Sequence, residues 1–382
     1  MSSAPTTRPG QQPDAGAPEA PLLQIQGLAV SYGRRAARVV GGAAKSARVL
    51  SDVRLDVRAG EIVGIIGETG SGKTTLARAT VGLVRPDAGR IAFGGRDLTT
   101  LRRGALRDFR RSGRVQYMFQ DPLRSQDPEL TVRRIVAEPL AAVGALDWRE
   151  RAARADEALT LVGLDPDVFG SRTPGQISGG QRQRVSLARA IVTRPRLLLT
   201  DEPVSALDAS NRNLVLSLLQ RLRRELGLAV VVISHDLSSL AGIADRVAVL
   251  YRGRLVEQGP IGDVLAHPRH PYTALLTASA PSVRREHRLL PAQLRASADR
   301  APWPDDEGCV FAPRCRFAGA ECREEPASAT VGGASARTAD GPASPGAAHG
   351  LASPGTDDRL TSPETSLTVA CHHAATWRDR LH

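Results

Sequence analysis

Nine consecutive residues combine glycines, one lysine and hydroxyl groups in an order that suits phosphate binding: Gly67-Glu68-Thr69-Gly70-Ser71-Gly72-Lys73-Thr74-Thr75. An apolar run at 62–66 precedes them and a helix-forming run follows at 76–79, so we expect strand, glycine loop and helix. In that order the backbone N–H groups of the loop turn inward and the helix N-terminus adds positive potential. Lys73 is then expected to reach the β- and γ-phosphates of a nucleotide, and the Thr74 hydroxyl to bind Mg²⁺.

The lysine itself supports this interpretation. The chain contains only two lysines, Lys45 and Lys73, and arginine supplies nearly all of the remaining positive charge. A lysine at the position where phosphate binding needs a compact ammonium indicates a functional role and not a chance match. The alternative, a glycine-rich turn that matches by chance, is disfavoured by the flanking strand and helix.

Two acids follow a second apolar run. Asp201 and Glu202 come directly after 197–200, a segment of the buried parallel-strand type. The carboxyl ends of such strands meet at the sheet edge where ligands bind in open α/β folds. We expect Asp201 to hold Mg²⁺, directly or through water, and Glu202 to act as a general base on an attacking water. A solvated acidic turn is the alternative.

A third signal is Ser178-Gly179-Gly180-Gln181, which precedes a helical pattern at 182–191. Small residues at a helix start present free N–H groups and a favourable dipole to an anion. Alone, the tetrapeptide is more often a helix-capping turn. Its position 20 residues before the acidic pair makes it more specific.

Composition bounds the class of protein. The 382 residues suffice for one large domain or two ordinary ones, and the net charge is +11. Nucleic acid is not the expected partner, because the arginines are scattered and aromatic residues make up only 3%. No apolar run approaches the roughly 18 residues that cross a bilayer, and residues 1–21 lack the apolar core of a signal peptide. We therefore expect a cytosolic chain that contacts a membrane only through a partner.

Periodicity outlines the organisation. Residues 1–20 are expected to form a disordered tail. Alternating apolar positions predict strands over 22–33 and 49–57, which would form a small antiparallel sheet. Residues 131–170 have helical periodicity, and further strands at 197–201 and 228–234 favour a doubly wound α/β core. Residues 326–368, rich in Ala, Ser, Gly and Pro, are expected to form a flexible insert.

Together these motifs resemble the nucleotide-binding subunit of an ATP-binding-cassette (ABC) transporter. Residues 67–74 match the Walker A loop, 177–181 the signature sequence, and 197–201 with Glu202 the Walker B strand. The resemblance implies a P-loop NTPase cassette over 21–265. Its parts would be a RecA-like parallel-sheet core, an antiparallel β subdomain, and a helical signature subdomain at about 121–180. A smaller, cysteine-containing region would occupy 266–382.

Four further positions match family elements in the expected order. Gln120 matches the glutamine loop, Asp208 ends the D-loop, His235 matches the switch histidine, and Tyr32 matches the aromatic residue that stacks on adenine. Taken singly, each residue has a structural explanation that involves no nucleotide. Gln120, for example, could be a surface residue and Tyr32 a packing residue at a strand edge. By this resemblance the catalytic residues are Glu202, His235 and Gln120, the Mg²⁺ ligands are Thr74, Gln120 and Asp201, and the nucleotide contacts are Tyr32, Gly67, Glu68, Thr69, Gly70, Ser71, Gly72, Lys73, Thr74, Thr75, Asp201, Ser178, Gly179, Gly180, Gln181 and Asp208.

In this family the ATP site is shared between two subunits. Lys73 of one subunit would face Ser178–Gln181 of the other in a head-to-tail dimer, so that ATP holds the cassettes together and hydrolysis releases them. The single cassette implies pairing with itself or with a homologous subunit.

The C-terminal part narrows the class of transporter. Residues 267–276 resemble the His-Pro-Tyr segment that follows the cassette in oligopeptide, dipeptide and nickel importers. The implied partners are two membrane permeases and an extracytoplasmic solute-binding protein, and the implied location is the cytoplasmic face of the inner membrane. From the residues alone, the prolines merely end one helix and start another.

All four cysteines, Cys309, Cys315, Cys322 and Cys371, lie in this part, with five, six and 48 residues between them. A cytosolic chain disfavours disulfides, and four thiolates can complete a tetrahedral Zn²⁺ site or an iron–sulfur site. The spacing resembles the cysteine region of peptide-importer ATPases, for which a [4Fe–4S] cluster is implied. Four unrelated thiols are the alternative.

Three other classes stay open. A DNA-repair or chromosome ABC ATPase would carry long coiled coils before the signature, whereas only 57 residues separate Gln120 from Ser178. A translation-associated protein normally has two cassettes. An exporter ATPase would not predict the His-Pro-Tyr segment. The motifs of the ATP-binding subunit do not distinguish a nickel importer from a peptide importer.

Overall fold

The computed structural model describes residues 20–32, 47–119, 125–144, 146–205, 207–279, 289–296, 308–331 and 366–381. Nearly all of the expected tail, 1–20, and most of the expected insert lie outside these ranges. Within them, no helix combines the length and the apolar character that a membrane span requires.

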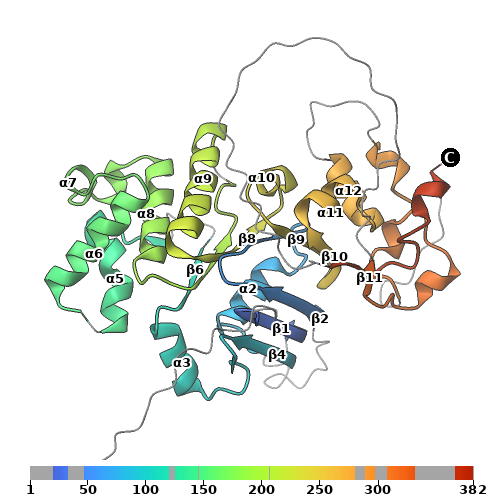
Figure 1. Cartoon of the computed structure of the whole chain (residues 1–382), viewed down its shortest axis with the longest axis horizontal. Helices are drawn as coiled ribbons and strands as arrows, with labels where there is room; N and C mark the ends of the chain where they lie inside the picture. The colour runs from blue at the N-terminus through green and yellow to red at the C-terminus, as the bar shows by residue number, and fades with distance from the viewer. Residues whose placement is uncertain are drawn as a thin grey trace, which may run out of the picture.

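The main sheet has eight strands in the order β11-β12-β10-β9-β3-β8-β7-β6 (Figure 1). From β6 to β9 neighbouring strands run parallel, and β10, β12 and β11 extend the sheet in antiparallel fashion. The parallel strands are β3 (Ile62–Ile66), β6 (Val115–Met118), β7 (Leu197–Asp201), β8 (Ala229–Ser234) and β9 (Arg246–Tyr251).

Both faces of this sheet are buried, which is why its strands are nearly continuous apolar runs. Along β7, Leu198 packs into one core and Leu197 and Leu199 pack into the other, as the period of two requires. The first core also contains α8 (Gly179–Ile191), α9 (Ala209–Leu226) and much of the C-terminal region. The second lies between the main sheet, α2 (Lys73–Thr80) and the small sheet.

The small sheet is antiparallel, as the alternating pattern predicts, in the order β2-β1-β4-β5. Its inward side chains, such as Leu28, Val30 and Val53, are completely buried. A helix, α3 (Arg103–Arg111), follows it, and Figure 1 shows both below the main sheet. The strands are β1 (Leu23–Tyr32), β2 (Ala47–Val57), β4 (Ala88–Phe93) and β5 (Arg96–Asp97).

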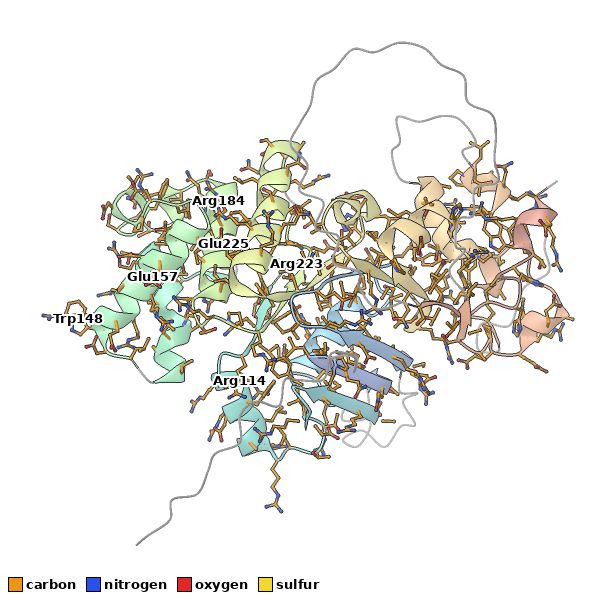
Figure 2. All side chains as sticks on the ribbon, in the orientation of Figure 1. Arg114, Trp148, Glu157, Arg184, Arg223 and Glu225 are labelled. Carbon is orange, nitrogen blue, oxygen red and sulfur yellow. The ribbon has the colours of Figure 1, made fainter. Side chains whose placement is uncertain are left out.

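The helical periodicity over 131–170 is confirmed by three helices that pack beside α8 at the left of Figure 1. The longest, α6, begins with a capping box between Asp147 and Glu150. Trp148, at its first turn, is 68% exposed and stands at the outer edge of this lobe in Figure 2. The helices are α5 (Val132–Val143), α6 (Trp148–Leu161) and α7 (Pro166–Phe169).

The C-terminal region continues the main sheet. The strand β12 pairs with β10 and β11, and Phe311 and Trp377 are completely buried in the same core as the sheet. The boundary expected at 265 therefore does not separate two cores. The elements are α10 (Leu237–Ala241), β10 (Arg254–Pro260), α11 (Ile261–Ala266), α12 (Pro271–Ser279), β11 (Ala329–Val331) and β12 (Leu367–Val369).

The limits of the insert expected at 326–368 need correction. Its two ends, β11 and most of β12, are paired strands and not a flexible segment. The sequence did not indicate them because each is only three residues long, too short to show an alternating pattern. Residues 332–365 of the insert lie outside the described residues.

Candidate nucleotide site

The glycine loop connects β3 to α2, in the predicted order of strand, loop and helix. Gly67 and Gly72 are required by close packing. A Cβ on Gly67 would lie 2.1 Å from the Leu250 carbonyl oxygen, and one on Gly72, where φ is +106°, would lie 2.7 Å from the Leu50 side chain. The loop is therefore seated firmly between β9 and β2.

Lys73 points back into the loop. Its Nζ donates to the carbonyl oxygens of Gly67 at 2.7 Å and Glu68 at 2.9 Å. Burial lowers the pKa of Lys73, while the nearby Glu202 and Asp201 carboxylates act in the opposite direction. The Ser71 hydroxyl is buried and has no hydrogen-bond partner among the described residues. A buried ammonium beside an unpartnered hydroxyl fits an anion such as phosphate.

Thr74, at the N-terminal end of α2, meets Asp201, at the carboxyl end of β7. The Thr74 hydroxyl donates to Asp201 Oδ2 at 2.8 Å, and the Tyr117 hydroxyl on β6 donates to the same oxygen at 2.9 Å. A hydroxyl and a carboxylate are ligands that suit Mg²⁺, so these residues fit the ion that the sequence predicts. Sequence analysis missed Tyr117, because the pairing of its strand with β7 is visible only in the structure.

Glu202 and His235 form the second part of the site. They follow β7 and β8, which are adjacent, and Glu202 Oε1 lies 3.1 Å from His235 Nδ1. Glu202 adopts the left-handed backbone conformation, with φ of +50°, and its N–H donates to the Ile233 carbonyl. This turn aims the carboxylate across the sheet edge toward His235.

Glu68 has partners that the sequence did not reveal. Its carboxylate accepts from both terminal nitrogens of Arg314, at 2.7 and 2.9 Å, and its backbone N–H donates to the Tyr272 hydroxyl at 2.9 Å. The hydrogen bond from Arg314 lowers the pKa of Glu68. Its side chain therefore faces the C-terminal region.

The segment before α12 contains a buried histidine. His270 Nδ1 accepts from the Tyr272 N–H at 3.0 Å, and Glu257 accepts from the N–H groups of Arg269 and His270. Burial lowers the pKa of His270 to about 3, so the imidazole is neutral and Nε2 carries the proton.

This burial predicts a pH dependence of stability. Below its ordinary pKa of 6.5, His270 binds a proton in the unfolded chain but not in the folded chain until about pH 3. Stability should therefore fall by about 1.4 kcal/mol per pH unit from this group, or about 2 kcal/mol at pH 5. His270→Asn keeps an acceptor for the Tyr272 N–H but does not titrate. Urea unfolding measures the free energy of unfolding at pH 7 and at pH 5. The decrease between these pH values should be about 2 kcal/mol smaller in the variant than in the natural chain. An equal decrease would contradict the burial of a neutral His270.

The tetrapeptide 178–181 caps α8. Ser178 Oγ accepts from the Gln181 N–H, and Gln181 Oε1 accepts from the Ser178 N–H at 2.8 Å, which is a complete capping box. A Cβ on Gly180 would lie 2.6 Å from Asn211 Oδ1. In Figure 1 α8 lies with the helical lobe and α2 lies near the centre, so one chain does not bring the two motifs together.

Three other expected residues lie apart from this cluster or outside the description. Asp208 is the N-cap of α9, where four hydrogen bonds from Ser210 and Asn211 hold its pKa well below the usual range. Tyr32 ends β1 and is 45% exposed. Gln120 lies outside the described residues.

The four cysteines gather in the C-terminal region. Cys309, Cys315 and Cys322 are buried, and no disulfide joins the four. Burial, together with the other three thiols, raises the pKa of Cys371 to about 12. In the described part of the chain, no three His, Cys, Asp or Glu side chains are placed to hold a metal ion. The side chains as they lie do not fit the expected cluster or Zn²⁺.

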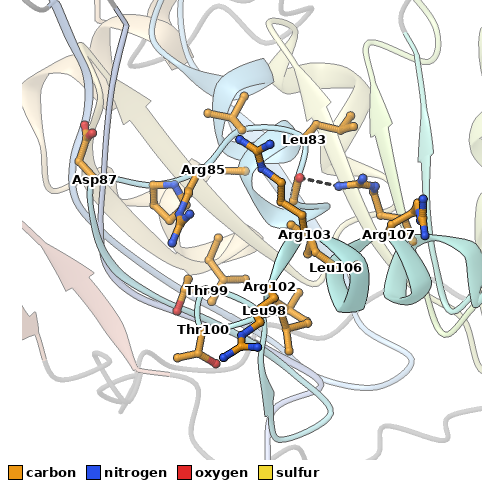
Figure 3. Close-up of a pocket in the computed structure, with 18 residues that line it drawn as sticks. Leu83, Arg85, Asp87, Leu98, Thr99, Thr100, Arg102, Arg103, Leu106 and Arg107 are labelled. Atoms are coloured by element: carbon orange, nitrogen blue, oxygen red, sulfur yellow. Dashed lines mark hydrogen bonds between the residues drawn. The ribbon is translucent and has the colours of Figure 1, made fainter. Parts of the chain in front are cut away.

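A cavity of about 1120 Å³ lies between α2 and α3, apart from the glycine loop (Figure 3). Five of its 18 lining residues are arginines, and Arg110 donates to the Gly82 carbonyl at 2.8 Å. None of the predicted nucleotide contacts lines it. The arginines are Arg85, Arg102, Arg103, Arg107 and Arg110.

Two family profiles match the sequence. The ABC transporter profile matches residues 50–205, and the profile of the oligopeptide/dipeptide transporter C-terminal region matches residues 256–322. A protein of Brucella ovis, provisionally named a peptide import ATP-binding protein, is 42% identical over 304 residues, which are 78% of this chain and 91% of the relative. The oligopeptide transport ATP-binding protein OppF of Salmonella typhimurium is 40% identical over 285 residues, 73% of this chain and 84% of OppF.

Solved structures resemble the cassette. The dimeric, post-hydrolysis structure of the ATP-binding cassette MJ0796 bound to ADP and phosphate has a TM-score of 0.55 and 29% identity, and covers 63% of this chain and 98% of that one. CbiO1 of Clostridium perfringens, part of an ABC transporter complex, has a TM-score of 0.56 and 27% identity, and covers 65% and 92%. These matches confirm the predicted α/β cassette fold.

Proposed function

The chain belongs to the ABC transporter family of ATP-binding proteins, and from this premise we propose that it is the ATP-hydrolysing subunit of an importer for oligopeptides or dipeptides. The observation that carries the proposal is the convergence of the glycine loop, Asp201 and the Glu202–His235 pair at one sheet edge. The match of residues 256–322 to the oligopeptide/dipeptide transporter region supports the substrate class.

The loop binds the triphosphate. Lys73 donates two of its three N–H groups to the loop carbonyls and keeps the third for the β- and γ-phosphates, and Ser71 and the α2 N-terminus add donors. Thr74 and Asp201 would hold Mg²⁺, which neutralises charge on the phosphate oxygens when it is bound. Tyr117 orients the Asp201 carboxylate through their hydrogen bond.

Glu202 and His235 act on the attacking water. Glu202 accepts a proton from the water as it approaches the γ-phosphate, and its contact with His235 Nδ1 fixes the direction of the carboxylate. Gln120 completes this part by the family resemblance. The water replaces ADP on the γ-phosphorus, so the step produces ADP and phosphate. Separation of the two cassettes after hydrolysis would drive transport.

The site requires a second cassette. The capping box at the start of α8 engages the N–H groups of Ser178 and Gln181, and the N–H groups of Gly179 and Gly180 suit a phosphate on a partner subunit. Asp208, kept ionised at the start of α9, would lie at the same interface. The dimeric form of the similar cassette MJ0796 supports this arrangement.

The remaining partners follow from the importer class. Two membrane permeases would hold the subunit at the cytoplasmic face of the inner membrane, and an extracytoplasmic binding protein would deliver the peptide. The name of the relative OppF, an oligopeptide transport ATP-binding protein, supports a role in oligopeptide transport.

The test is co-purification from cell membranes followed by reconstitution in vesicles. We expect two permeases to accompany the tagged chain, and ATP hydrolysis to rise when a peptide-loaded binding protein is added. Recovery of the chain with DNA or ribosomes would contradict the proposal. Stimulation by nickel but by no peptide would refute the substrate class and leave the ATPase assignment intact.

A further inference from the structure

Two side chains from the C-terminal region contact the phosphate-binding loop. Tyr272 lies in α12 and Arg314 lies beyond 308, yet both contact Glu68, the second residue of the loop. These contacts span 204 and 246 residues of sequence. The nucleotide chemistry described above uses neither residue.

One peptide group links Tyr272 to Lys73. The Gly67–Glu68 peptide is trans, so its C=O and N–H point in opposite directions. Its carbonyl oxygen accepts from Lys73 Nζ at 2.7 Å, and its N–H donates to the Tyr272 hydroxyl at 2.9 Å. Rotation of this peptide would break both bonds together. Tyr272 therefore fixes the carbonyl that orients Lys73.

Arg314 holds the same residue from the side. Its two terminal nitrogens bind the two oxygens of Glu68 in a bidentate pair, and its guanidinium lies 5.8 Å from the centre of the Tyr251 ring. The Glu68 carbonyl, on the other side of this residue, is the second acceptor for Lys73. The two carbonyls that hold Lys73 thus belong to Glu68, which the C-terminal region contacts directly, and to its neighbour Gly67.

The two contacts rest on a rigid base. The rings of Tyr272, Tyr251 and Phe311 pack with centroids 4.5 to 5.4 Å apart, and all three residues are at most 2% exposed. Tyr251 immediately follows Leu250, whose carbonyl closely approaches Gly67. The cluster therefore joins the C-terminal region, β9 and the loop in one packed unit.

We propose that Tyr272 and Arg314 are positioning residues for Lys73, and that the C-terminal region through them sets the affinity of the loop for ATP. The proposal deepens the ATPase function proposed above and rests on it. Because binding linkage is reciprocal, nucleotide at the loop also stabilises the Arg314 segment.

Binding of Mg-AMP-PNP, a nonhydrolysable ATP analogue, tests the proposal by calorimetry on the full chain. Tyr272→Phe removes one hydroxyl, and its Kd should rise about 3- to 10-fold. Arg314→Gln should raise Kd by about 10-fold, and Arg314→Lys should recover part of the loss. The matched control is Arg316→Gln, in the same segment, whose exposed side chain contacts the Gln293 carbonyl and not the loop. Its Kd should equal that of the natural chain.

A second measurement separates positioning from general stability. Amide hydrogen exchange over 308–323 should slow when the analogue binds to the natural chain, and this slowing should shrink in Arg314→Gln. If that variant does not fold, Glu68→Gln weakens the same pair from the loop side and should give the same two results. Unchanged Kd values and unchanged exchange in folded variants would overturn the proposal. Failure of the natural chain to bind the analogue would instead refute the ATPase function on which it rests.

Discussion

Glu202→Gln is expected to leave ATP binding intact and to lower turnover by about 10²- to 10⁴-fold. Glutamine keeps the size of the side chain and can still contact His235, but it cannot accept a proton from water. Lys73, Thr74 and Asp201 are untouched, so the nucleotide stays bound. Phosphate release under saturating Mg-ATP measures the turnover, and retention of labelled ATP on a spin column measures the binding.

The matched control for this change is Glu225→Gln. Glu225 lies on the exposed face of α9 and forms a surface ion pair with Arg221 at 3.8 Å, so hydrolysis should stay within about twofold of the natural chain. Unchanged hydrolysis in Glu202→Gln would refute the role of Glu202. Loss of hydrolysis in both variants would point to a general effect of removing negative charge.

Lys73→Ala has the second large expected effect, a rise in the Kd for Mg-ATP of about 100-fold or more. Two loop carbonyls hold the buried Lys73 ammonium in place. Alanine leaves the phosphates without this charge-assisted donor. Calorimetry with Mg-ATP measures the loss. Binding of Mg-ATP at the natural affinity would contradict the assignment of this loop.

Folding must be monitored in the same experiment, because Lys73 also donates to Gly67 and Glu68. The melting temperature without nucleotide should change by only a few degrees. Arg224→Ala, which removes a cation from the exposed C-terminal end of α9, serves as the control and should bind Mg-ATP normally.

Motifs at strand ends were predictable from the sequence. Lys73, Asp201 and His235 each follow an apolar run that forms a buried parallel strand, and the carboxyl ends of neighbouring parallel strands meet at one edge. Local order along the chain was therefore enough to predict their proximity. The order of the strands in the sheet, β3-β8-β7, could not be read from the spacing alone.

Contacts between distant segments were not predictable. Nothing around Arg314 or Tyr272 indicates Glu68, because an ion pair across 246 residues leaves no periodic pattern in either segment. The strands β11 and β12 are missed for a related reason. They are stabilised by β10 and by the core beneath it, and not by a propensity visible in three residues.

The four cysteines show the opposite case. Their spacing suggested a common ligand, and the chain does gather them, but in the part of the chain that the structure describes the side chains are not arranged to hold a metal ion. Cysteine spacing thus predicted proximity and not the geometry of a site.

The central claim is that bound ATP holds two cassettes together. Its most direct test is to measure by sedimentation the mass of the Glu202→Gln variant in the presence of Mg-ATP. The variant is examined alone and mixed with the second cassette subunit of its transporter. The account predicts a doubled mass that retains ATP and returns to the single mass when Lys73→Ala is added to the variant. ATP bound to a particle that stays at the single mass in both samples would contradict it.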